Sequence, residues 1–221
     1  THSKGTLDSA TTRKRHTPLI CAVRYGEPDV VGRLLAMGAT PDRRGQIDDL
    51  TPLYRSLSSI GEIRKPAQRA QSLRGSLLAD PDHVQREVRR RYTISPGGVF
   101  GDERTLRDSL AHPGHLAIFE GLVAAIVKEE AGRLSEPKLL HIVELLLKAG
   151  ANPNAAHQYP VRGRTPLMLA AENDSAEAFD LMMHHGGDPY RQDAEGQDCI
   201  RIALGFGSRR VVERLRRLGI M

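Results

Sequence analysis

The chain of 221 residues contains no tryptophan, and aromatic residues make up only 4% of it. Its hydrophobic fraction of 39% therefore comes mainly from leucine, alanine, valine and isoleucine. A core of such aliphatic side chains favours paired helices over a β-sandwich.

Cysteines and long apolar runs are also scarce. Cys21 and Cys199 lie near opposite ends of the chain, too far apart in a stacked array for a disulfide, which needs Cα atoms within about 7 Å. We expect both to be small buried side chains. No run approaches the roughly 18 apolar residues of a transmembrane helix. The favoured compartment is the cytoplasm, with the periplasm as the alternative if a signal peptide preceded Thr1.

The stretch from Arg164 to Pro189 predicts two short antiparallel helices. Thr165 is a good N-cap, and Pro166 suits the first helical position, where its missing N–H costs nothing. Leucine and alanine then recur at helical spacing up to a polar turn. A second apolar helix follows and ends at Gly186, because glycine readily takes the left-handed conformation.

The same pattern recurs along the chain at a fixed distance. Thr17 precedes Gly38 by 21 positions, and Thr165 precedes Gly186 by the same number. Asp198 follows Thr165 after 33 positions. Recurrence at a fixed period indicates a repeat architecture more strongly than any single match.

The last repeat is expected to close the array. The residues predicted to face the interior are Ile200, Ala203, Leu204, Val211, Val212, Leu215 and Leu218. Arginines fill most of the other positions of its second helix, so this repeat resembles a C-terminal cap with a polar outer face.

The second repeat is divided. Its first helix is predicted at 51–61 and its second at 138–154, so Thr51 and Gly150 stand 99 positions apart instead of 21. About 78 extra residues, at 62–137, are far too many for an ordinary connection between paired helices. They predict an insertion.

The insertion has mostly helical patterns. We expect helices at 68–79, 82–92, 103–111 and 115–131. In an alternative arrangement, the 115–131 helix is itself the first helix of a degenerate repeat and pairs with 138–149.

These repeats resemble the ankyrin family, through the Thr-Pro-Leu starts at 17–19, 51–53 and 165–167, the paired alanines at 170–171 and the closing glycines. The resemblance implies an all-α ankyrin-repeat solenoid of about four helix pairs with a helical insertion. The expected organisation is a flexible lead-in at 1–15, the first repeat and a half at 16–61, the insertion at 62–137, and the remaining repeats at 138–221.

One feature departs from the family pattern. Ile20, Tyr54 and Met168 stand where ankyrin repeats usually carry the histidine of Thr-Pro-Leu-His. We therefore expect the hydrogen-bond network of that histidine to be missing.

The resemblance also implies where binding occurs, since ankyrin proteins usually contact partners through the hairpin tips and the inner helices. Tyrosine and arginine, which are enriched at binding hot spots, are frequent at these positions. The candidate partner-binding residues are Arg24, Tyr25, Asp42, Arg43, Arg44, Tyr54, Arg55, His157, Tyr159, Arg162, Tyr190 and Arg191. The alternative is that they are solvated turn residues.

The predicted function is that of a protein–protein interaction scaffold for one specific partner. Arg-rich bacterial ankyrin proteins suggest, by analogy, an immunity protein that neutralises a toxin. The alternative is a secreted bacterial effector or enzyme with its active site in the insertion. No G-x-S-x-G or H-E-x-x-H motif occurs, and we expect no catalytic residues and no cofactor.

Two further patterns are interpreted as structural. The basic run at 86–92 predicts a solvated helix face, and the alternative is a basic patch for an acidic protein or a nucleic acid. We expect no nucleic-acid partner, since Tyr92 is the only aromatic residue nearby for base stacking. The neighbouring histidines His184 and His185 point about 100° apart on a helix and cannot easily share a metal ion. His112 and His115 flank a Pro-Gly turn without a suitable second ligand pair.

Overall fold

The computed structural model describes residues 8, 16–45, 49–80, 84, 86–87, 113–158 and 161–221. Over these residues the secondary structure is helical, apart from an isolated bridge between His157 and Arg164, which confirms the predicted all-α class. The chain forms two compact units. Unit 1 is Thr1–Arg64 with Leu134–Met221, and unit 2 is Lys65–Arg133.

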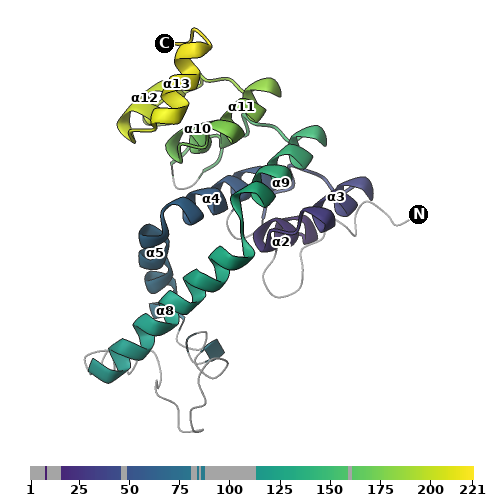
Figure 1. Cartoon of the computed structure of the whole chain (residues 1–221). Helices are drawn as coiled ribbons and strands as arrows, with labels where there is room; N and C mark the ends of the chain where they lie inside the picture. The colour runs from purple at the N-terminus through teal and green to yellow at the C-terminus, as the bar shows by residue number, and fades with distance from the viewer. Residues whose placement is uncertain are drawn as a thin grey trace. The chain divides into compact units, whose positions relative to one another are not determined.

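Unit 1 is a stack of four helix pairs (Figure 1). Its helices are α2 (Pro18–Tyr25), α3 (Pro28–Ala36), α4 (Pro52–Arg64), α9 (Glu136–Lys148), α10 (Pro166–Glu172), α11 (Ala176–His184), α12 (Cys199–Gly205) and α13 (Arg209–Arg217). The pairs are α2 with α3, α4 with α9, α10 with α11, and α12 with α13. The first members pack side by side as an inner layer, and the second members form the outer layer.

Each inner helix begins at the predicted cap. The side-chain oxygens of Thr17, Thr51 and Thr165 accept the backbone N–H three residues later at 3.2–3.3 Å. Asp198 does the same for Arg201 at 2.8 Å. These bonds satisfy N–H groups that the first helical turn leaves without an intrahelical partner. The pairs close on glycines at 38, 150, 186 and 219, all at positive φ.

The core of unit 1 lies between the two layers and between consecutive pairs. Its fully buried aliphatic and aromatic residues include Leu19, Val23, Val31, Leu53, Leu57, Val143, Leu167, Ala170, Phe179, Ala203, Val211 and Leu215. Two residues predicted to face this interior, Leu204 and Leu218, are instead exposed by 54% and 52%. Both belong to the last pair, which no further pair covers in the described part of the chain. None of the described helices has the length and apolar content needed to cross a bilayer.

Unit 2 has a separate small core between α5 (Pro66–Leu78) and α8 (Pro113–Arg133). Its buried residues are Leu73, Leu77, Val84, Phe119, Leu122 and Val123. The guanidinium of Arg74 makes a bidentate ion pair with Glu120, with Nε 2.9 Å from Oε1. The expected helices at 82–92 and 103–111 lie largely outside the described residues, as does the lead-in at 1–15 apart from Asp8.

The packing of these helices bears on the divided repeat. α4 packs against α9 although unit 2 lies between them in the sequence, and α8 packs against α5. The inner helix that packs against α9 is thus α4. That unit 2 is an insertion into an ankyrin repeat, with the limits given above, stays a proposal.

Candidate protein-binding surface

Three hairpin tips join consecutive pairs, at 39–50, 151–164 and 187–197, and neighbouring tips are bonded to one another. The backbone N–H of Asn152 donates to both carboxylate oxygens of Asp42 at 3.1 Å. At the next junction the N–H of Asp188 donates to Asn154 Oδ1 at 2.8 Å. Asp42 and Asn154 each stand four residues after the closing glycine of their pair. The same bond thus recurs in register and orders the tips into one ledge.

Arg44 strengthens the first of these junctions. Its Nη2 donates to the carbonyl of Ala156 at 2.6 Å, and its Nη1 pairs with Asp49 at 2.8 Å. Burial raises the pKa of Asp42. The hydrogen bond from the Asn152 N–H and the charge of Arg44 lower this pKa, but by less than burial raises it. Asp42 and Arg44 are candidate partner-binding residues by sequence, but their polar atoms are already engaged in joining the first two tips.

Tyr54 and His157 lie in the interior, with 3% and 0% of their surfaces exposed. Their rings are 4.1 Å apart. Nε2 of His157 accepts the N–H of Thr51 at 3.2 Å, and its Nδ1 lies 3.3 Å from the Arg164 carbonyl. In this arrangement neither side chain is available to a partner. The network also corrects the expectation of a missing histidine: a histidine is present here, but it comes from the tip.

Burial sets the ionisation of this pair. Desolvation lowers the pKa of His157 to about 4, and the Arg44 charge adds to the effect. Desolvation raises the pKa of Tyr54 to about 12, with a further contribution from Glu172. Both groups are therefore neutral at pH 7, as expected for side chains that support a junction.

Arg164 forms a buried ionic cluster that the sequence analysis missed. Its guanidinium lies 3.5 Å from Glu172 Oε2 and 3.6 Å from Asp193 Oδ2. Oδ1 of Asp193 accepts the N–H groups of Glu195 and Gln197, each at 2.9 Å. Arg164 thereby anchors the third tip to α10. The residue stands directly before the Thr165 cap, but no local pattern signals its contact with Asp193, which lies in a tip about 30 residues further along the chain.

Four predicted residues project from the tips: Arg43, Arg162, Tyr190 and Arg191, all exposed. Tyr190 is 59% exposed, and its backbone is held by an N–H bond to Asp188 Oδ1 at 3.0 Å. Among the described residues, no ion pair engages the three arginine side chains. The ledge therefore carries cations and an aromatic ring on a bonded backbone.

The remaining candidates lie on the inner helices. Tyr25 is 55% exposed at the end of α2, and Arg24 is half-buried with its Nη1 3.0 Å from His16 Nε2. Arg55 is half-buried on α4. Tyr159 lies outside the described residues. Of the twelve candidates, the exposed ones are thus on α2 and on the tips.

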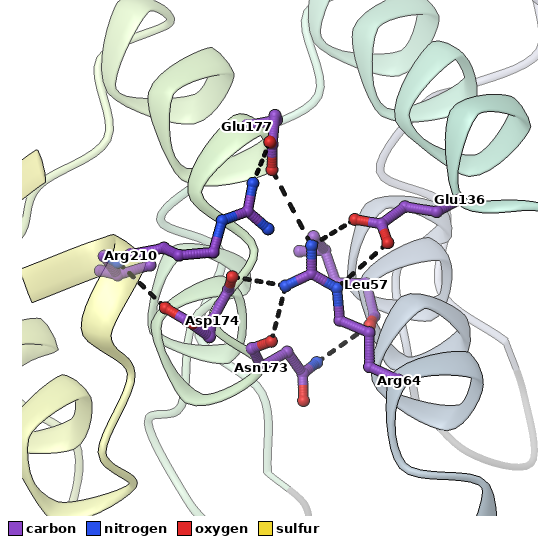
Figure 2. Close-up of polar contacts among 8 residues, drawn as sticks. Leu57, Arg64, Glu136, Asn173, Asp174, Glu177 and Arg210 are labelled. Atoms are coloured by element: carbon purple, nitrogen blue, oxygen red, sulfur yellow. Dashed lines mark hydrogen bonds and ion pairs between the residues drawn. The ribbon is translucent and has the colours of Figure 1, made fainter.

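A second network crosses unit 1 at the turns that follow the inner helices (Figure 2). Arg64, the last residue of α4, makes a bidentate ion pair with Glu136 at the start of α9 and donates to the carbonyls of Asn173 and Asp174. Asn173 donates to the Leu57 carbonyl at 3.1 Å. Asp174 and Glu177 continue the network to α13 through the Val211 N–H and Arg210. The network joins the last three pairs. It also holds the end of α4 beside the start of α9, which are the segments of unit 1 that flank unit 2 in the sequence.

The outer layer contains a groove between α9 and α11. It is lined by Pro137, Leu140, His141, Glu144, Glu177, Asp180, Leu181 and His184. Its carboxylates are already paired, Glu144 with Lys148 at 2.6 Å, Glu177 with Arg210, and Asp180 with Arg214 at 2.9 Å. Within the described ranges, no group of three or more histidine, cysteine or carboxylate side chains could hold a metal ion. Cys199 is buried, which raises its pKa to about 12, whereas Cys21 is only half-buried.

Paired short helices, stacked in two layers with bonded tips, define a helical repeat protein of the solenoid class. The family description "Ankyrin repeats (3 copies)" matches residues 134–220, and "Ankyrin repeat" matches residues 14–46. Together the two matches span more than half of the chain. The chain belongs to the ankyrin-repeat family.

Curated relatives support the same assignment. The human ankyrin repeat domain-containing protein 63 is 37% identical over 92 residues, which is 39% of this chain. The mouse protein of the same name is 38% identical over 82 residues, or 35% of this chain. The matched segment spans only 23% and 20% of the length of these relatives. Ankyrin repeats are protein-interaction modules, so the chain carries a protein–protein interaction scaffold.

Proposed function

We propose that unit 1 binds one folded protein partner through the ledge of tips, with Arg43, Arg162, Tyr190 and Arg191 as the contacting side chains. The observation that carries this proposal is the recurrent bond between neighbouring tips, from Asp42 to Asn152 and from Asn154 to Asp188. A backbone that is ordered before binding loses little conformational entropy when the complex forms. Tyr25 and Arg24 extend the surface onto α2.

The exposed residues of the ledge include Asp188 and Glu195 as well as Arg43, Arg162 and Arg191, and the arginines are the ones that support a proposal about the partner. No carboxylate among the described residues pairs with Arg43, Arg162 or Arg191, so these arginines would gain charge-assisted hydrogen bonds from an acidic surface. The chain as a whole has a net charge of +5. We therefore propose a partner with an acidic contact surface, which would associate faster at low salt because opposite charges steer the encounter.

The test is quantitative capture from lysates of the source cell with the full chain as bait. In one variant, Arg43→Glu, Arg162→Glu and Arg191→Glu are combined, and in a second Tyr190→Ala is made alone. A matched control, Arg33→Glu with Lys138→Glu and Arg209→Glu, makes the same charge change on exposed residues of the outer layer. A stoichiometric partner should be retained by the control and lost by the ledge variants, with circular dichroism unchanged.

Other outcomes would redirect or contradict the proposal. Equal loss with the control variant would mean that net charge, and not the ledge, governs capture. In a further bait, Lys65–Arg133 is replaced by a short Gly/Ser linker. If this bait alone loses the partner, recognition belongs to unit 2. No partner for any folded bait would contradict the scaffold function and favour the rival, an effector or enzyme with its site in unit 2.

Neutralisation of a toxin by an immunity protein is a narrower form of this proposal. It rests on analogy with bacterial ankyrin proteins alone, and the curated relatives reported above are mammalian. Identification of the captured partner by mass spectrometry decides it. A partner with no toxic activity when expressed without this chain would end the immunity hypothesis and leave the scaffold function standing.

A further inference from the structure

The three junctions between neighbouring helices of the described outer layer are filled in different ways. Five residues before its closing glycine, α9 carries Leu145, and a β-carbon added at Gly32 of α3 would meet this side chain at 3.9 Å. At the same position α13 carries Arg214, whose Nε lies 2.9 Å from Oδ2 of Asp180 on α11. The first junction is thus closed by an aliphatic contact and the last by an ion pair.

The middle junction, between α9 and α11, follows neither pattern. The corresponding residues are Leu181 on α11 and Glu144 on α9, and an aliphatic side chain cannot pair with a carboxylate. An open groove of about 620 Å³ lies here, and both residues line it. We call it the outer groove. It lies inside the array, because α9 also packs against α3 and α11 also packs against α13.

The outer groove has the length and the apolar character that suit a third helix. Leu140 and Leu181 are only half-buried where they line it, and Pro137 is exposed. The lining residues recur at helical spacing from 137 to 144 on α9 and from 177 to 184 on α11, so the groove follows about two turns, or roughly 10 Å, of each helix. Two turns of an amphipathic helix present an apolar stripe of this length.

The lining of the outer groove is also acidic. It includes the carboxylates of Glu144, Glu177 and Asp180 but no lysine or arginine. Glu177 is paired with Arg210 of α13 (Figure 2), and Asp180 is paired with Arg214. The cations of α13 therefore neutralise the two carboxylates on α11, and Glu144 is the acidic group on the α9 side.

Glu144 has partners on its own helix. Its carboxylate lies 2.6 Å from Nζ of Lys148 and 3.6 Å from Nδ1 of His141. The hydrogen bond from Lys148 holds the pKa of Glu144 below its ordinary value, so the carboxylate is ionised at pH 7. Because the Lys148 side chain is 64% exposed, this ion pair contributes little to stability, and a cation from a partner can take its place.

We infer that the outer groove is a second docking surface, whose occupant is an amphipathic helix of a partner protein with an apolar stripe flanked by lysine or arginine. The stripe would cover the exposed parts of Leu140 and Leu181. A flanking cation would pair with Glu144, as Arg214 pairs with Asp180 at the next junction. The inference does not depend on the ledge, and it gives the scaffold a second partner of the opposite charge.

A second copy of this chain fits the outer groove less well. Its helix α13 has the required arginines, but Val211 and Leu215 on that helix are fully buried in their own core. These side chains cannot enter a groove on another molecule, so α13 would offer cations without the apolar stripe.

A designed peptide tests the inference on the full chain. The probe is a fluorescein-labelled helical peptide with leucine at i, i+3, i+4 and i+7 spacing and lysine on both flanks. The control peptide has glutamine in place of every lysine. Fluorescence anisotropy should show binding of the lysine peptide, which weakens as salt is added, and much weaker binding of the glutamine peptide. Because the chain has a net charge of +5, its overall field repels the lysine peptide, and a preference for it reports a local acidic site.

Variants separate the apolar and charged contributions. Leu181→Arg copies the residue of α13 at this position and should weaken the lysine peptide by at least about tenfold, since the new guanidinium would occupy the groove beside Glu144. Glu144→Gln keeps the apolar surface and should remove most of the salt dependence. Glu195→Gln makes the same charge change at an exposed residue of the ledge and should leave peptide binding unchanged.

Three results would overturn the inference. They are equal binding of the two peptides, no binding of the lysine peptide, and unchanged binding by a Leu181→Arg variant with native circular dichroism. Should Leu181→Arg prevent folding, Glu144→Lys reverses the charge outside the core and must itself weaken the lysine peptide. Sedimentation velocity covers the other occupant, since a wild-type dimer that Leu181→Arg dissociates would assign the groove to a second copy.

Discussion

At the scale of the residue, His157 illustrates why a single-sequence prediction can place a side chain wrongly. Histidine in a polar tip suggests a surface residue, and nothing local in the sequence links it to Thr51, 106 positions away. The acceptor role of Nε2 toward the Thr51 N–H requires an unprotonated nitrogen there, while Nδ1–H can donate to the Arg164 carbonyl. If Nε2 were protonated, its N–H would point at the Thr51 N–H, so two donors would face each other without an acceptor.

This arrangement predicts a pH dependence of stability. The pKa of His157 is about 4 in the folded chain against 6.5 for an ordinary histidine, so the unfolded chain binds more protons between these values. The stabilisation is complete above pH 6.5 and is lost as the pH falls toward 4. Urea unfolding should show a loss of about 2 kcal/mol from this group between pH 7 and pH 5. His157→Gln should have a shallower pH slope than the wild type. Identical slopes would contradict a buried neutral histidine.

At the scale of the element, the sequence predicted the helices of unit 1 well, because most of them begin at a threonine, aspartate or serine N-cap and each pair closes on a glycine. What it did not predict is the closeness of α4 to the turn after α10. A β-carbon added at Gly61 on α4 would lie 2.5 Å from Oδ1 of Asn173. Asn173 is buried, and its amide donates to the Leu57 carbonyl, so it has little room to withdraw.

Gly61→Ala should therefore destabilise the chain, although alanine favours a helix more than glycine. We expect a loss of about 1–3 kcal/mol in the free energy of unfolding from overpacking. Gly32→Ala on α3 is the matched control, since its β-carbon would meet only Leu145 at 3.9 Å, and it should raise stability by up to about 1 kcal/mol. In an Asn173→Ala background the cost of Gly61→Ala should shrink. If Gly61→Ala costs the same in the Asn173→Ala background as in the wild type, the contact with Asn173 is not the cause of the destabilisation.

At the scale of the whole molecule, the repeat period predicted which helices pair across a long separation. The matched family segments leave residues 47–133 uncovered, yet α4 in this interval occupies the inner layer between α2 and α10. The sequence Thr51-Pro52-Leu53, which matches the start of the other repeats, was the basis for predicting an inner helix here. The network around Arg64 could not be predicted in the same way, since its partners lie 72 to 110 positions away and follow from the stack itself.

The Arg64 network predicts that unit 1 folds without unit 2. Arg64 and Glu136 hold the end of α4 beside the start of α9. A linker of about eight Gly and Ser residues, which spans roughly 25 Å when extended, should therefore replace Lys65–Arg133 without strain. This shortened chain should keep helical circular dichroism and a single cooperative thermal transition.

Within the shortened chain, Arg64→Met should lower the free energy of unfolding by about 1–3 kcal/mol, because the carbonyls of Asn173 and Asp174 would lose their donor. The comparison variant is Arg217→Met, which removes only an exposed ion pair with Glu213 and should cost less than about 0.5 kcal/mol. A shortened chain without a cooperative transition would mean that the four pairs depend on unit 2 for their stability. Equal effects of the two substitutions would mean that Arg64 contributes no more than an ordinary surface ion pair.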